Sequence, residues 1–287
     1  MSIRDAYVEF IRAGNVDGSN KASSYIRALD LLQPILKRKI PDELKAESIW
    51  NVTSPEHAQE LYKLVLLHRQ LGDEGFFKNE KPVSYWRDGF CSAALRSYKT
   101  FLVTYRYEEQ MWNTYNDTSI SREEVGDRLA DVEVESAEVL LEDINISQKG
   151  GQGLDAVREV KTRIGQGFFR KMILRQYSNQ CCITGLNVSD VLRASHITSW
   201  AEDYENRMNP SNGLCLSATY DAAFDRHLIS FDEQYRMILS PVLSEYYTNK
   251  AFKDYFLSKE GVAISNPCTH APDMTLLEKH REVMLSR

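Results

Sequence analysis

The sequence lacks three features that would place it in a familiar class. No stretch approaches 18 consecutive apolar residues, and the acidic residues near the N-terminus leave no apolar export signal, so no membrane association is predicted. The five cysteines have neither a C-x-x-C pair nor regular spacing, which favours reduced thiols and a cytoplasmic location. The chain also lacks a basic excess, with 35 Lys and Arg against 41 Asp and Glu. Indiscriminate coating of nucleic acid is therefore not expected.

The negative charge is concentrated in one segment. Residues 1–104 hold 15 basic and 13 acidic side chains, residues 158–287 hold 16 and 15, and residues 105–157 hold 4 and 13. The middle segment ends in the glycine cluster KGGQG, which is typical of a linker, and we expect one amphipathic helix in it at 132–141. We therefore expect two domains, 1–104 and 158–287, joined by an acidic linker, 105–157, that either is solvated or covers a basic surface.

Helical periodicity dominates residues 1–104. Ser2 can cap a helix that continues through Arg12, and Ser54 before Pro55 combines an N-cap with a proline at the first helical position. The aromatic residues of this region have a helical spacing more typical of a core than of a surface that stacks on nucleobases: Tyr25, Trp50, Trp86 and Tyr98. The pattern predicts an α-helical domain, and we find no catalytic constellation in it.

The stretch 158–177 differs from the rest because its charge is almost entirely positive. Its only acid is Glu159, against six basic residues: Arg158, Lys161, Arg163, Arg170, Lys171 and Arg175. This stretch is either a solvated helix face or an element that contacts phosphates.

The segment 181–233 divides into three pieces. VLRASHI is a β-branched run ending near Ser195 and His196, NPSNGLCLS is a turn leading into a short apolar strand, and SATYDAAFDRHL is a helix that Ser217 can cap. The order strand, loop, strand, helix is that of a ββα unit. His227, at the end of this helix, is expected to adopt the left-handed conformation of a C-cap.

Two acids of the predicted helix suggest a metal site. Asp221 and Asp225 are four residues apart, so both carboxylates project from one face, where they repel each other. A divalent cation between them would make the arrangement favourable, and oxygen ligands suit Mg²⁺ or Mn²⁺ better than Zn²⁺. Taken without its neighbours, the pair is better explained as two solvated helix acids.

The succession of His196, Asn212, Asp221 and Asp225 resembles the HNH endonuclease family. The fragments RIGQGFFR, CCITG, ASHI, NPSNGLCL, YDAAFD and LISFD resemble its bacterial restriction endonucleases, over residues 158–287 with a core at 178–240. The resemblance implies a C-terminal ββα-metal nuclease domain. Together with the α-helical N-terminal domain, which we expect to recognise DNA, and the acidic linker, it gives an expected α+β protein. The resemblance also implies metal-dependent hydrolysis of DNA phosphodiester bonds to 5′-phosphate and 3′-hydroxyl ends.

The resemblance implies roles for single residues. His196 matches the general base, and Asn212 matches the asparagine that orients it. Asp221 and Asp225 match metal ligands, while Ser195 stands where many relatives have a metal-binding aspartate or histidine. With Ser195 a weak ligand, we expect modest affinity for Mg²⁺ or Mn²⁺.

Further expectations concern DNA and partners. Phosphate contacts are expected from Arg170, Lys171, Arg175 and Arg207, although supporting the Asn212 turn is an equal alternative for Arg207. Structural zinc is not expected, since the candidate ligands lack paired spacing: Cys182, Cys215, Cys268 and His270. One ββα unit makes one cut and a duplex needs two, so a homodimer on double-stranded DNA is expected. The alternatives are a low-specificity nicking nuclease and a catalytically inert HNH-fold protein that binds DNA or another protein.

Overall fold

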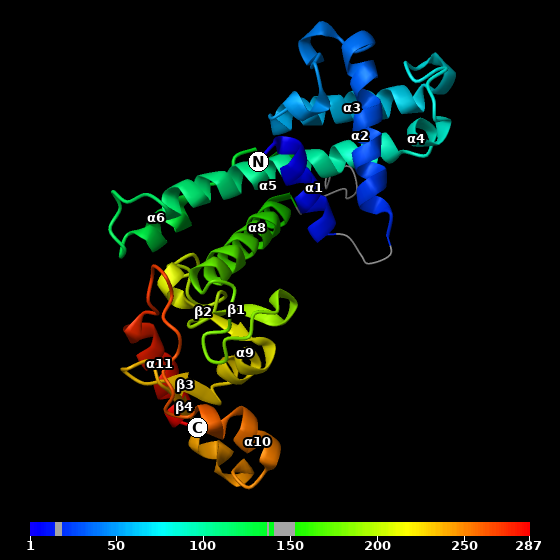
Figure 1. The fold of residues 1–287 in the computed structure, drawn as a ribbon. Helices are drawn as coiled ribbons and strands as arrows, with labels where there is room; N and C mark the ends of the chain where they lie inside the picture. The colour runs from blue at the N-terminus through cyan, green and yellow to red at the C-terminus, as the bar shows by residue number, and fades with distance from the viewer. Residues whose placement is uncertain (15–18, 137, 141–152) are drawn as a thin grey trace. The chain divides into compact units, whose positions relative to one another are not determined.

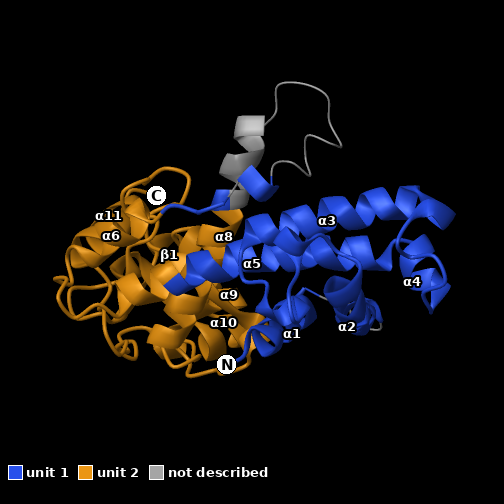
Figure 2. Ribbon diagram, turned by 90° about the horizontal axis from the view of Figure 1, so that it is seen from above, with its two compact units in different colours: residues 1–109, 133–161 blue, residues 110–132, 162–287 orange. Residues whose placement is uncertain are grey.

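The computed structural model describes residues 1–14, 19–136, 138–140 and 153–287, with side chains from residue 161 onward in the last of these ranges (Figure 1). The chain forms two compact units. Unit 1 comprises residues 1–109 and 133–161, and unit 2 comprises residues 110–132 and 162–287 (Figure 2). The chain passes between the units inside α5 (Phe90–Tyr115), again between residues 132 and 133, and inside α8 (Gly153–Gln176).

Unit 1 is built from helices. Besides its parts of α5 and α8, it contains α1 (Ile3–Ala13), α2 (Lys21–Arg38), α3 (Pro55–Gln70), α4 (Val83–Arg87) and 3₁₀ turns at Asp42–Leu44, Ile49–Asn51 and Gly72–Glu74. The two predicted caps are confirmed: Ser2 Oγ accepts a hydrogen bond from the Asp5 amide, and Ser54 Oγ accepts one from the His57 amide, both at 3.1 Å.

Aromatic side chains form the centre of unit 1. Tyr7 lies edge-on to Tyr98 and to Phe101, with ring centroids 5.3 and 5.4 Å apart, and Tyr98 is fully buried. The Tyr98 hydroxyl donates to the carbonyl of Val52 at 3.0 Å, which satisfies its one polar group. Tyr98 and Trp86 therefore belong to the core, as their spacing predicts.

Unit 2 combines helices with two small sheets. Besides its parts of α5 and α8, it contains α6 (Val125–Asp131), β1 (Leu192–His196), β2 (Gly213–Ser217), α9 (Ala218–Asp225), β3 (Ile229–Phe231), β4 (Met237–Leu239), α10 (Lys250–Tyr255) and α11 (Met274–Leu285). Short 3₁₀ turns lie at Ser189–Val191, Pro210–Asn212, Pro241–Tyr246 and Leu257–Lys259. β1 pairs antiparallel with β2, and β3 pairs antiparallel with β4.

The β1–β2 hairpin lies between α8 and α9. His196 pairs with Gly213, and a side chain at Gly213 would place its Cβ 2.8 Å from Phe169 Cζ and 2.7 Å from Ile173 Cγ1, both on α8. Only glycine allows α8 to approach the hairpin this closely. The five residues of β2 are all buried, which explains its almost continuous apolar sequence.

The helix α9 begins and ends near the predicted residues. Ser217 occupies the N-cap position, but its side chain makes no capping hydrogen bond. At the other end His227 has φ of 51°, its amide donates to Phe224 at 2.8 Å, and the Leu228 amide donates to Ala223 at 2.9 Å. These two bonds form a Schellman cap, so the predicted left-handed residue is confirmed.

The acidic segment 105–157 is divided between the units, and a separate linker is not confirmed. Of the helix predicted at 132–141, residues 132–136 are not helical, residues 138–140 are helical, and residues 137 and 141 lie outside the described part. Instead, α6 precedes it and packs in unit 2, where a Cβ on Gly126 would lie 3.0 Å from Asn209 Cβ. None of the described helices is long and apolar enough to cross a membrane.

Candidate active site

His196, the last residue of β1, lies among aromatic rings on the α8 side of the hairpin. Phe169 of α8 stacks on its ring, with centroids 3.7 Å apart and planes 13° apart. Trp200 approaches the same ring edge-on, with centroids 5.4 Å apart. Gly165 of α8 makes room for this indole, because a Cβ there would lie 3.3 Å from Trp200 Cη2.

The surroundings of His196 define its protonation state. Nε2 lies 3.2 Å from the carbonyl oxygen of Arg207, which can only accept, so Nε2 carries the hydrogen. Burial lowers the pKa of His196 to about 4, and the bond to the Arg207 carbonyl opposes this shift. Near neutral pH the ring is therefore neutral, and its lone pair is on Nδ1, which has no hydrogen-bond partner among the described residues.

A polar network fixes the loop that supplies this carbonyl. Asn212 Oδ1 accepts from the Thr198 amide at 2.9 Å, and Asn212 Nδ2 donates to the Asn206 carbonyl at 2.9 Å. Asp203 accepts from Thr198 Oγ1 at 2.9 Å and from the Asn206 side chain at 2.8 Å. These bonds hold the pKa of Asp203 below its usual value, although burial acts in the opposite direction. The backbone just before Arg207 is thus tied to both ends of the loop.

The predicted metal residues meet on the α9 side of the hairpin. The Ser195 hydroxyl donates to Asp221 Oδ1. Burial, and then the negative charge of Asp221, raise the pKa of the Asp225 carboxyl. Asp225, at the end of α9, is exposed, while Asp221 is half-buried. The two carboxylates therefore repel each other, as the sequence predicts.

The structure therefore brings the predicted residues together in two groups. Ser195 and the acid pair lie on the α9 side of β1, and His196 and the Arg207 carbonyl lie on the α8 side, since neighbouring side chains of a strand point to opposite faces. No hydrogen bond joins His196 to either acid among the described residues. The two groups meet at the end of β1, where Ser195 and His196 are consecutive residues.

The acid pair fits a weakly held hard cation. Within the described residues, no group of three or more His, Cys, Asp or Glu side chains could hold a metal ion. Two carboxylates, of which Asp225 is exposed and has its pKa raised by burial and by the charge of Asp221, leave most of a cation's coordination to water and substrate oxygens. That donor set suits Mg²⁺ or Mn²⁺, which retain several waters when bound.

The basic residues expected at DNA have different surroundings. The Arg170 guanidinium donates to the carbonyls of Leu192 at 2.8 Å and Ser189 at 3.1 Å, so it ties α8 to β1. Arg175 is exposed, with its guanidinium 4.8 Å from the Trp112 ring, and Lys171 is exposed on the same helix.

Arg207 supports the loop with its side chain as well as its backbone. Its Nε donates to the carbonyl of Trp200, and its guanidinium lies 3.5 Å from the ring centroid of Tyr204. Arg207 was expected either to contact a phosphate or to support the Asn212 turn. Its contacts within the loop fit the second role.

Sequence reasoning missed the residues that set the environment of the base. Phe169 and Gly213 bring α8 against the His196 ring, and Thr198 and Asp203 complete the Asn212 network. The fragment RIGQGFFR contains Phe169, but a stacking partner cannot be read from a single helix. Asp203 and Asn206 in the fragment TSWAEDYEN were the available signal for the network, because such residues favour local side-chain to backbone bonds.

Comparison with known proteins agrees with this geometry. Residues 181–232, which include the hairpin and α9, match the model of a family described as HNH endonuclease. This match suggests nuclease activity and nucleic-acid binding in general. No curated protein matches the chain.

Proposed function

We propose that this protein is a divalent-metal-dependent DNA endonuclease that hydrolyses phosphodiester bonds to 5′-phosphate and 3′-hydroxyl ends. The observation that carries the proposal is the neutral His196, whose Nε2 hydrogen is held by the Arg207 carbonyl and whose Nδ1 lone pair has no partner among the described residues. That tautomer is the one a general base needs.

In the proposed reaction, Nδ1 of His196 removes a proton from the attacking water. The Arg207 carbonyl keeps the ring oriented and accepts from Nε2 before and after this transfer. Asn212 acts indirectly, because it fixes the loop that presents the carbonyl. General-base assistance of this kind contributes about 10²–10⁴ in rate.

Asp221 and Asp225 would hold Mg²⁺ or Mn²⁺, which when bound supplies positive charge to the scissile phosphate and the leaving 3′ oxygen. The Ser195 hydroxyl orients Asp221 by donating to Oδ1. In an in-line displacement, the attacking and leaving oxygens lie on opposite sides of phosphorus. A base on one side of β1 and an acid pair on the other agree with that requirement.

The biological role we propose is restriction of double-stranded DNA by a homodimer, with residues 1–104 recognising sequence or base modification and unit 2 cutting. Phosphate contacts are assigned to Lys171 and Arg175, and more weakly to Arg170 and Arg207, whose guanidinium groups bind backbone carbonyls. The alternative, an inert binding protein, is favoured by one observation: the serine beside the base bonds to a metal acid where a further ligand would lie.

Plasmid digestion tests the proposal and separates it from the alternative. The parent should cleave in Mg²⁺ or Mn²⁺ and stop cleaving when a chelator is added. His196→Ala should lose about 10²–10⁴ in rate while keeping its DNA affinity. Asp225→Asn should need a higher metal concentration for half-maximal cleavage. Glu245→Gln, at an exposed acid of unit 2, serves as the matched control.

The outcomes are distinct. Binding without cleavage at any metal concentration would support the inert protein. Cleavage by His196→Ala at the parental rate would remove His196 as the base, and an unchanged metal titration for Asp225→Asn would remove Asp225 as a ligand.

A further inference from the structure

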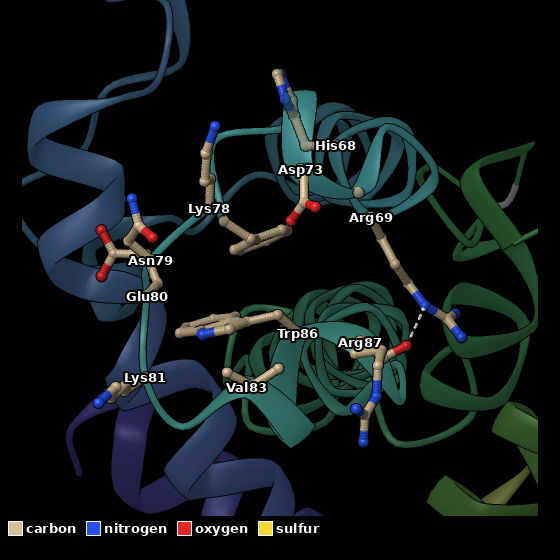
Figure 3. A pocket seen from close by; sticks show the side chains of 12 residues that line it. His68, Arg69, Asp73, Lys78, Asn79, Glu80, Lys81, Val83, Trp86 and Arg87 are labelled. Atoms are coloured by element: carbon tan, nitrogen blue, oxygen red, sulfur yellow. Dashed lines mark hydrogen bonds between the residues drawn. The ribbon is translucent and has the colours of Figure 1, made fainter.

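A pocket of about 520 Å³ opens on unit 1, between the end of α3 and α4. Its lining comes from residues 68–87, so it is complete within one short stretch of the chain. Figure 3 shows the Trp86 indole inside a ring of polar side chains, with Lys78, Asn79 and Glu80 on one side and Arg69 and Arg87 on the other. The volume lies within the range of small-molecule sites, about 300–1,000 Å³.

The rim of this pocket is positively charged, although the protein carries a net charge of −6. Its charged residues are four cations and two acids: Arg69, Lys78, Lys81, Arg87, Asp73 and Glu80. From outside the pocket, Lys39 neutralises Glu80 at 2.8 Å and Asp88 neutralises Arg87 at 2.9 Å, which leaves Arg69, Lys78 and Lys81 against Asp73. Lys78 and Lys81 are exposed and have no ion pair within the described residues. The rim therefore attracts an anion.

The wall of the pocket is aromatic and contains an unmet donor. Trp86 is 5% exposed and stacks on Phe77, with ring centroids 4.7 Å and planes 16° apart. The Nε1 hydrogen of Trp86 is buried and finds no acceptor in the described part of the chain. A buried donor without a partner carries a desolvation cost that a ligand acceptor would remove.

These features together describe a ligand with phosphates, a flat ring and an acceptor on that ring. A lone phosphate would leave most of the volume and the indole unused. We propose that the pocket binds one nucleotide of a DNA strand, turned out of the base stack, with its phosphates on Lys78 and Lys81 and its base beside Trp86. The choice of DNA as the ligand rests on the proposed function. The pocket and the charge of its rim are observed independently of that function.

The test measures DNA binding without cleavage. Full-length protein carrying His196→Ala, in chelator, is titrated into labelled duplexes that are either fully paired or contain one unpaired nucleotide, over a series of salt concentrations. Removing two phosphate contacts by Lys78→Ala with Lys81→Ala should reduce the slope of log K against log salt by about 1.8, since each contact contributes about 0.9. The control, Arg12→Ala with Lys21→Ala, removes the same charge from exposed sites of unit 1 outside the pocket and should keep the parental slope.

Trp86→Phe tests the base contact separately, because it keeps an aromatic ring and deletes the Nε1 donor. We expect about tenfold weaker binding to the duplex with an unpaired nucleotide and little change for the paired duplex. A thermal melt of each variant establishes that unit 1 is folded, and the lysine variants, which change only exposed side chains, remain a valid test if Trp86→Phe is unstable.

The failures can be told apart. If the parent binds no DNA, the proposed function and the pocket assignment both fall. If the parent binds DNA and the lysine variant keeps its affinity and slope, the pocket assignment alone is overturned. If a free deoxynucleoside monophosphate binds and the lysine variant loses that binding but not DNA binding, the site takes free nucleotides and the assignment to a DNA strand is wrong.

Discussion

The acidity of His196 is controlled by the ring that covers it. Phe169 lies face to face with the imidazole and covers that face, and burial is the cause that lowers the pKa of His196 to about 4. The base form therefore dominates above about pH 4, and activity limited by this group should rise at a lower pH than for an ordinary histidine, whose pKa is about 6.5.

Phe169→Leu should expose the imidazole and raise the pKa of His196 toward 6.5. The acid limb of the kcat/KM profile should then move to higher pH, and NMR titration of the ring should show the same shift. Phe168→Leu is the matched control, because Phe168 is buried on the same helix against Trp112. An unshifted titration in Phe169→Leu would show that the stacked ring does not set this pKa.

Asp203 is expected to act at a distance from the reacting atoms. Its carboxylate holds Thr198 and Asn206, and Asn206 directly precedes the residue whose carbonyl orients His196. A small displacement of that carbonyl should lower kcat by about 10²-fold and leave KM almost unchanged. Asp203→Ala tests this, with Glu205→Ala, an exposed acid of the same loop, as control. An increase in KM alone would assign Asp203 to substrate binding.

The sequence offers candidates for the chemical residues of the site more readily than for the residues that surround them. His196, Asn212 and the acid pair could be selected because each has a reactive or hydrogen-bonding side chain at a recognisable spacing. The contact of Phe169 with His196 depends on how α8 packs on the hairpin, and that packing depends in turn on the absent side chain of Gly213. Such tertiary contacts leave no local signature.

At the scale of elements, a buried histidine joins α11 to α9. His280 stacks on Phe224 at 3.9 Å and donates from Nε2 to the Phe224 carbonyl at 3.0 Å, while Ser230 Oγ lies 3.1 Å from Nδ1. Burial, and then the nearby His227, lower the pKa of His280 to about 4. Between about pH 6.5 and 4 the unfolded chain binds a proton at this residue that the folded chain does not.

The free energy of unfolding should therefore fall on acidification through this window, by up to about 1.4 kcal/mol per pH unit from His280. Urea unfolding of His280→Gln at several pH values should show a correspondingly shallower dependence. Ser230→Ala keeps the titrating ring and should keep the parental slope. Equal slopes for His280→Gln and the parent would mean that His280 titrates alike in the folded and unfolded chains.

Helix boundaries could be predicted from the sequence where a local feature, such as a capping side chain, marks the end of the helix. Ser2 and Ser54 cap their helices as predicted, and His227 ends α9 as predicted. Ser217 stands at the predicted N-cap position of α9, but its side chain makes no capping hydrogen bond. Amphipathic spacing alone was a poorer guide at 132–141, where the described residues 132–136 are not helical.

At the scale of the whole molecule, charge did not reveal how the chain is partitioned. The acidic segment was expected to be one linker, yet its described residues 105–109, 133–136 and 138–140 belong to unit 1 and 110–132 belong to unit 2. Two of the three crossings between the units lie within the continuous helices α5 and α8, so no break in composition marks them. Gly126 of α6 lies against Asn209, which places part of this segment beside the loop of the candidate site.

The proposed dimer gives the last prediction. Each chain contains one β1–β2–α9 unit, so one chain should cut one strand, and a double-strand break should need two active copies. An equimolar mixture of parent and His196→Ala, allowed to exchange subunits, contains about one quarter fully active dimers if pairing is random. Linear plasmid should then form at about one quarter of the rate of the undiluted parent dimer, while nicked circles accumulate from the mixed dimers. If linear product instead forms in proportion to the amount of parent protein, at about half the parental rate, the inactive copy only dilutes the active one. Each chain would then cut both strands on its own, and the dimer would not be required.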